Sequence, residues 1–145
     1  MDCALILADH AEVADSKLFI NCGGWTWIGP QVGPIALGLI FDVDRNEANM
    51  RHSISIYLVD EDGQPVIVSP INQALHVSMD FEVGRPPGSI AGMPLTSSMA
   101  FNVGPLPLVP GKRSSWVVEL ASVTPSKTRR RQFAVRPSPP VSITG

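Results

Sequence analysis

The three histidines, His10, His52 and His76, are the side chains of this sequence best suited to metal binding or acid–base chemistry. A metal site needs two or more of them together with a carboxylate or a thiol, and none is paired at metal-ligand spacing. Asp9 precedes His10, but neighbouring strand residues point to opposite faces, so the two form no dyad unless the strand ends there. We therefore expect surface or rim histidines, with no metal, no cofactor and no catalytic residue.

Acidic residues at Asp42, Asp44 and 60–62 resemble the loops of calcium-binding sandwiches. Calcium takes about six to eight oxygen ligands, and the 60–62 segment lacks the EF-hand spacing. We therefore interpret these acids as turn and cap residues. The serine pairs at 97–98 and 114–115 lack a Gly-x-Ser-x-Gly elbow and a local base, which makes a small hydrolase the third and least favoured function.

Trp25 and Trp27 are the most informative aromatic pair, because two residues spaced by two on an extended segment share a face. If they are exposed, they form an aromatic platform for a sugar or a protein hot spot. If they are buried, they belong to the core or to a subunit interface. We favour the core or interface, and keep the ligand platform as the alternative.

Composition narrows the class of protein further. The chain has 145 residues, a size typical of one domain, with 44% hydrophobic residues and 14 prolines. Its net charge of −2 argues against nucleic-acid binding, which needs a basic surface. The first residues lack the features of a signal peptide and no segment is apolar enough for a membrane helix, so we expect a cytoplasmic protein with Cys3 and Cys22 reduced.

Hydrophobic residues alternate with a period of two, which is typical of strands with one buried face. The clearest stretches are residues 36–43, 52–59, 76–83, 98–103, 115–120 and 132–136. Their spacing predicts an all-β protein: an antiparallel, Ig-like β-sandwich of about seven to nine short strands. From the same alternation we expect these residues in the core: Ile54, Ile56, Val77, Met79, Phe81, Phe101 and Val118.

Turn and breaker residues fit this interpretation. Residues 61–64 predict a turn in which Gly63 supplies a positive φ. Residues 44–50 predict one or two helical turns, with Asp44 as the cap and Glu47 at capping-box spacing. We expect a single domain over residues 1–136, followed by a proline-rich extended arm at 137–145. The basic run 129–131 is interpreted as a charged guard on an edge strand, with an anionic partner as the alternative.

Several local motifs resemble an uncharacterised family of small bacterial proteins that look like stand-alone β-sandwiches. The motifs begin at Ala8 (ADHAEV), Gly23 (GGWTWIGP), Leu58 (LVDEDGQP) and Phe81 (FEVGRPPG). The resemblance covers roughly residues 3–136. It implies a fold but no activity, and the two cysteines do not look like part of the shared pattern.

The function we favour from the sequence is a non-enzymatic binding or assembly module that associates with itself or with another protein, and with neither nucleic acid nor membrane. One version is a structural component of a larger particle, such as a phage or prophage shell or tail, which would place the chain in a virion. The main alternative is a carbohydrate-binding module. The residues proposed for the interface or ligand platform are Trp25, Trp27, Leu106, Leu108, Val141 and Ile143.

Overall fold

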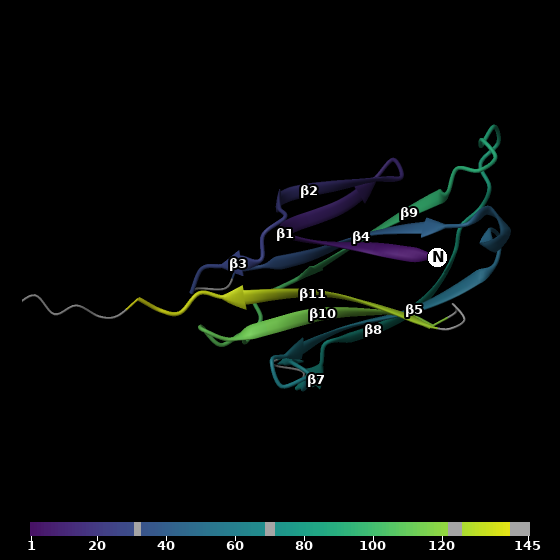
Figure 1. Ribbon diagram of the computed structural model, residues 1–145. Coiled ribbons are helices and arrows are strands. Elements are labelled where there is room, and N and C mark those ends of the chain that lie inside the picture. The colour runs from purple at the N-terminus through teal and green to yellow at the C-terminus, as the bar shows by residue number, and fades with distance from the viewer. Residues whose placement is uncertain (31–32, 69–71, 122–125, 140–145) are drawn as a thin grey trace, which may run out of the picture.

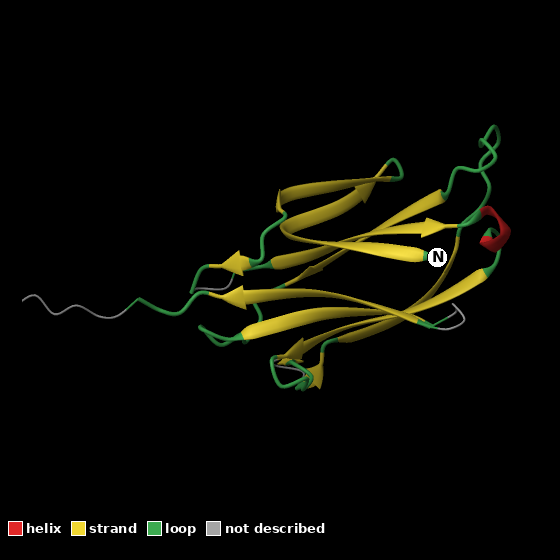
Figure 2. Ribbon diagram, in the orientation of Figure 1, coloured by secondary structure: helices red, strands yellow, loops and turns green. Residues whose placement is uncertain are grey.

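The computed structural model describes residues 1–30, 33–68, 72–121 and 126–139, which form two stacked β-sheets (Figure 1). The helical content of these residues is one short 3-10 turn at one end of the molecule (Figure 2). The predicted all-β antiparallel sandwich is therefore confirmed. Because three strands have only two residues each, the number of longer strands also agrees with the prediction.

Most neighbouring strands in the sheets pair in the antiparallel direction. The four-stranded sheet, here called sheet A, has the order β2 (Lys17–Gly23), β1 (Asp2–Ala14), β4 (Ile35–Val43) and β9 (Leu95–Val103). The five-stranded sheet, sheet B, has the order β3 (Trp27–Ile28), β11 (Lys127–Val135), β10 (Arg113–Leu120), β5 (Arg51–Asp60) and β8 (His76–Glu82). A small separate pair consists of β6 (Ile67–Val68) and β7 (Gln73–Ala74). The β3–β11 pair is parallel.

The first two strands form a hairpin that the sequence pattern did not reveal. Asp15 and Ser16 make the turn, and both have positive φ, 52° and 57°. Two-residue hairpin turns of this kind usually contain glycine, because glycine adopts positive φ without steric cost. Because this turn contains no glycine, the sequence gives little indication that the chain reverses between the two strands.

Strand β1 belongs to two pairings in succession. Residues 2–8 pair with β4, whereas residues 8–14 pair with β2. The second half lies over the outer face of sheet A, against β9. There the side-chain amide of Asn102 binds the backbone of Ala11 twice. The Ala11 N–H donates to Asn102 Oδ1 at 3.1 Å, and Asn102 Nδ2 donates to the Ala11 carbonyl at 2.6 Å.

Small residues allow the hairpin to approach sheet A closely. Leu18 and Ile20 of β2 pack with a cluster of alanines on this outer face. A Cβ added at Gly38 of β4 would lie 2.8 Å from Ile20 Cδ1, which is shorter than real contacts of this type. A larger residue at this position would therefore require the end of the Ile20 side chain to shift.

The main core lies between the inner faces of the two sheets, and one part of the core prediction is wrong. Ile54, Ile56 and Val118 are buried as predicted. Met79, Phe81 and Phe101 are half-buried, and Val77 is 37% exposed. The physical reason is that these four residues lie on β8 and β9, the last strands of their sheets, where no further strand covers them.

The local turn predictions hold. The 3-10 turn η1 spans Arg45–Glu47, with Asp44 as its N-cap, and the Asp44 N–H donates to Glu47 Oε1 at 3.4 Å. Gly63 has φ of 79° in the turn after β5, where the Gly63 N–H donates to the Asp60 carbonyl at 3.1 Å. These elements connect strands at opposite ends of the sandwich.

Candidate functional site

One side of the sandwich, between β8 and β9, is open. We call it the open side. Each strand is the last of its sheet, and no other strand is hydrogen-bonded to its free edge in the described part of the chain. Two hollows lie along this side. One, of about 580 Å³, is bordered by Met79 of β8, by residues 99–102 of β9 and by residues 10–13 of β1, which cross β9 at this level. The other, of about 330 Å³, is bordered by both Val77 and Phe101.

The side chains that face inward on the open side are apolar and only partly covered. They are Leu75, Val77, Met79, Phe81, Met99, Phe101 and Val103. Edge strands usually carry lysine, proline, a bulge or an inward charge, which discourages other strands from pairing with them. Neither β8 nor β9 contains lysine, arginine or proline, and β9 has no charged residue at all. The open side therefore has the chemistry of a strand-accepting surface.

A buried donor lies behind this surface. Trp116 of β10 is 2% exposed and borders the smaller hollow, and its Nε1–H has no hydrogen-bond partner among the described residues. A buried donor without a partner typically costs about 1–3 kcal/mol. The inner wall of the open side is therefore apolar with one unused donor.

The opposite side, between β1 and β11, is closed by polar contacts between the sheets. Arg129 Nε donates to Asp2 Oδ1 at 2.8 Å, and Lys127 Nζ donates to the Met1 carbonyl at 3.1 Å. The hydrogen bond from Arg129, supported by the backbone N–H of Cys3, lowers the pKa of Asp2 from 3.8 to about 2. Arg129 thus ties an edge of sheet B to sheet A, as expected for a charged guard residue.

The two tryptophans do not share a face, contrary to the prediction. Trp25 is half-buried against Phe133, with ring centroids 5.9 Å apart, and its Nε1 donates to Asp9 Oδ1 at 3.2 Å. Trp27 is 58% exposed and lines a separate pocket. The chain bends at Thr26, which turns the two rings into different environments.

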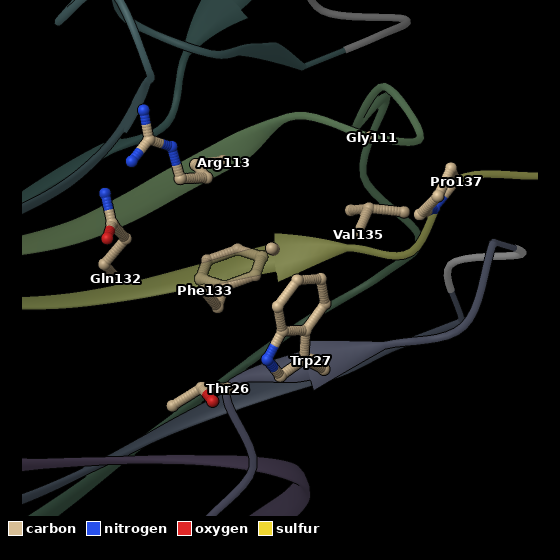
Figure 3. Close-up of a pocket in the computed structure, with 9 residues that line it drawn as sticks. Thr26, Trp27, Gly111, Arg113, Gln132, Phe133, Val135 and Pro137 are labelled. Atoms are coloured by element: carbon tan, nitrogen blue, oxygen red, sulfur yellow. The ribbon is translucent and has the colours of Figure 1, made fainter.

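The pocket at Trp27 combines an aromatic ring with polar groups. It has a volume of about 550 Å³ and is bordered by Trp27 of β3, Arg113 of β10, Gln132 of β11 and Pro137 (Figure 3). Arg113 Nε lies 4.0 Å from Glu61 Oε2, a distance at the limit of an ion pair. An exposed ring beside a guanidinium and an amide can stack on a flat ligand and bind its oxygens.

The other predicted interface residues have different positions. Leu106 is 7% exposed and belongs to the core, so it is not available at the surface, because its loop turns the side chain inward. Leu108 is half-buried against the same core. Val141 and Ile143 lie outside the described residues.

The histidines and serines form no close catalytic pair in the described ranges. His52 is 3% exposed, so its predicted surface or rim position is wrong: its Nε2 lies 2.9 Å from the Glu47 carbonyl and its ring packs on Phe81. On the exposed outer face of β8, Ser78 Oγ lies 3.4 Å from His76 Nε2, a long distance for a nucleophile and its base.

The remaining reactive groups are separated. Cys3 is buried on β1 and burial raises its pKa to about 12, whereas Cys22 is exposed on β2. No group of three or more His, Cys, Asp or Glu side chains in the described ranges is placed to hold a metal ion. Within the same ranges, no helix has the length and apolar character needed to cross a membrane.

These features define an all-β sandwich with two candidate binding surfaces, the open side and the Trp27 pocket. The chain belongs to a family of unknown function, DUF6941, whose model matches residues 3–120. The resemblance to an uncharacterised family is thereby confirmed, although the match ends before the last strand. No curated protein matches the chain.

Proposed function

We propose that this protein is a non-enzymatic assembly module that associates with itself through the open side. The observation that carries the proposal is the pair of unguarded edge strands, β8 and β9, whose inward apolar side chains are only partly covered. Covering apolar surface contributes roughly 25 cal/mol per Å² of area removed from water. Contiguous exposed apolar surface on a folded domain marks an interaction site more often than chance exposure.

The sandwich itself supports the choice of a strand-pairing contact. On the closed side, inward-facing charged residues discourage a further strand from pairing with the edge. The open side has no such residues. A partner strand on the open side would satisfy the free backbone groups and bury Met79, Met99 and Phe101 together. Closed, symmetric pairs are the commonest outcome when a chain binds a copy of itself.

The test is sedimentation velocity at tens of micromolar protein. We expect the wild type to associate and Val77→Lys to be monomeric, because the new charge points into the opening. Ser78→Lys is the matched control: it lies next to Val77 on the same strand but faces outward, and should associate as the wild type does. A monomeric wild type, or a Val77→Lys variant that associates normally, would refute the proposal.

We further propose that this association serves a larger particle, such as a phage or prophage shell or tail, in the cytoplasm or in the virion. Self-association of an open-sided sandwich supports this role, because particle components contact their own copies. The proline-rich segment 137–145, of which residues 140–145 lie outside the described part of the chain, is proposed as a second contact of such a component. The genes beside this one test the idea: neighbouring capsid or tail genes support it, and neighbouring sugar-metabolism genes contradict it.

A second candidate function is carbohydrate binding at the Trp27 pocket. The exposed Trp27 ring, with Arg113 and Gln132 beside it, supports this alternative. Oligosaccharides should then quench tryptophan fluorescence in the wild type and in Trp25→Phe, but not in Trp27→Ala, although Trp116 remains as a fluorophore. Unchanged fluorescence of the wild type across a panel of neutral and acidic oligosaccharides would exclude this function.

A further inference from the structure

The two strands of the open side are each complementary to themselves. We infer that the open side pairs with the same side of a second copy, about one two-fold axis that passes through Met79 and Met99. This inference rests on the proposed function, since it names the partner and the register of that association. Its result is a dimer in which both sheets continue across the contact.

Strand β9 supplies the first part of the argument. Met99 is the middle residue of the nine-residue strand, so antiparallel pairing centred on it uses the full length of the strand. Met99 then lies opposite its copy. The inward pairs are Ser97 with Phe101 and Leu95 with Val103; the outward pairs are Thr96 with Asn102 and Ser98 with Ala100. Each inward phenylalanine meets a serine, and none of the β9 pairs contains a charged residue.

Strand β8 has the same property independently. Met79 is the middle of its seven residues. Pairing centred there places Val77 opposite Phe81 on the inner face, again a smaller residue against a larger one. On the outer face it places His76 opposite Glu82, which are of opposite sign when the histidine is protonated. Like charges do not meet at any position of this register.

A single axis serves both strands, because their residues face each other level by level across the opening. Met79 and Met99 border one hollow, over which residues 10–13 of β1 also lie, and Val77 borders the next, with Phe101 lining both. At the following level, the Phe81 ring packs on Phe41 at 4.9 Å. Phe41 is in turn the β4 partner of Ser97.

A two-fold axis perpendicular to the sheets through the methionine level therefore pairs β8 and β9 simultaneously. Registers displaced by two residues lose this agreement. Centring β9 on Phe101 brings two phenylalanine rings together and leaves residues 95–98 without partners in the strand, and centring it on Ser97 leaves residues 100–103 unpaired. Either shift by two residues also moves the β9 axis about 7 Å away from Met79. The two strands then cannot pair about one axis.

Disulfide trapping tests the register in the full chain. The background is Cys22→Ser, which removes the exposed thiol, whereas Cys3 is buried. In this background Met99→Cys and Met79→Cys should each form a disulfide-linked dimer under mild oxidation, because a residue on the axis faces its copy within the Cα distance that a disulfide needs, about 4.4–6.8 Å. Ser97→Cys is the matched control. In this register it lies about 13 Å from its copy and should remain unlinked.

The outcomes separate the register from the association itself. If the chain associates but Ser97→Cys is linked and Met99→Cys is not, the inferred axis is wrong while self-association stands. If a chain ending at Pro137 is monomeric, the arm occupies the edge and the inference is overturned. We expect that truncated chain to associate as the full chain does. If the full chain is monomeric by sedimentation, the proposed function fails together with the register.

Discussion

The two lateral sides of this sandwich both have strand edges that could pair with another chain, and they differ in the residues at their inward positions. At the closed side, Lys127 and Arg129 occupy inward positions of β11 and bind Met1 and Asp2 of the other sheet. At the open side, the inward positions of β8 and β9 are all apolar or serine. One side is therefore guarded by charge, and the other has no inward charge. The two sides also differ in pairing, since β1 and β11 each have a short further partner, whereas β8 and β9 end their sheets.

The basic run at 129–131 gains its meaning from this comparison. Two interpretations were open, a guard on an edge strand and a surface for an anionic partner. Arg129 donates a hydrogen bond to Asp2, and the adjacent residue Arg130 faces the outside of sheet B. The guard interpretation accounts for the observed contact between Arg129 and Asp2. It needs no basic binding surface, which agrees with the net charge of −2.

The largest expected difference between the two sides is the cost of removing a phenylalanine. Phe133 of β11 is 1% exposed, so Phe133→Ala should lower the free energy of unfolding by about 3–5 kcal/mol. Phe101 of β9 is half-buried, and Phe101→Ala should cost roughly half as much in the monomer. Urea unfolding at sub-micromolar protein measures both. Equal costs would show that the open side is covered in the free chain.

A smaller effect is expected where β9 holds the first hairpin. Asn102→Ala removes both hydrogen bonds to the Ala11 backbone and leaves those buried groups without a side-chain partner. The expected loss of stability is about 1–2 kcal/mol. Thr96→Ala, an exposed outward position of the same strand, is the control and should change stability little. If both variants unfold alike, the Asn102 contact does not anchor the hairpin.

Much of the fold was predictable from the sequence, because strand alternation and turn glycines are local signals. The buried positions of β5 and β10, such as Ile54 and Val118, follow directly from alternation. Edge and centre strands, however, alternate alike. Val77 has the same pattern as Ile56, and the pairing that exposes one and buries the other is a long-range fact.

The candidate site was harder to predict for the same reason. The sequence singled out Trp27 together with Trp25, but the bend at Thr26 separates the two rings. Arg113 and Gln132 reach its pocket from strands far along the chain, so no local motif joins them. The open side could have been noticed in part from the charge-free sequence of residues 95–103, which is unusual for a strand at a sheet edge.

The smallest expected effect concerns the ion pair that closes the β1–β11 side. Because Arg129 holds the Asp2 carboxylate, the pKa of Asp2 is about 2 in the folded chain against an ordinary value of 3.8. A lowered folded pKa means that folding favours the ionised form. The contribution to stability is therefore fully present above about pH 4 and is lost as the pH falls toward 2. Asp2 is half-exposed, so solvent screens the pair and the contribution is small.

Asp2→Asn should consequently lower Tm slightly at pH 7, and the gap from the wild type should narrow by pH 3, when much of the wild-type advantage has been titrated away. Thermal unfolding of both proteins at the two pH values measures this directly. The matched control is Asp80→Asn on β8, at the open side, where the side chain contacts Ser53 and Arg51 within its own sheet and does not join the two sheets. A gap for Asp2→Asn that stays the same from pH 7 to pH 3 would mean that the Asp2–Arg129 pair is not what stabilises the closed side, where the Lys127–Met1 contact and the buried Cys3, Leu7 and Phe133 remain.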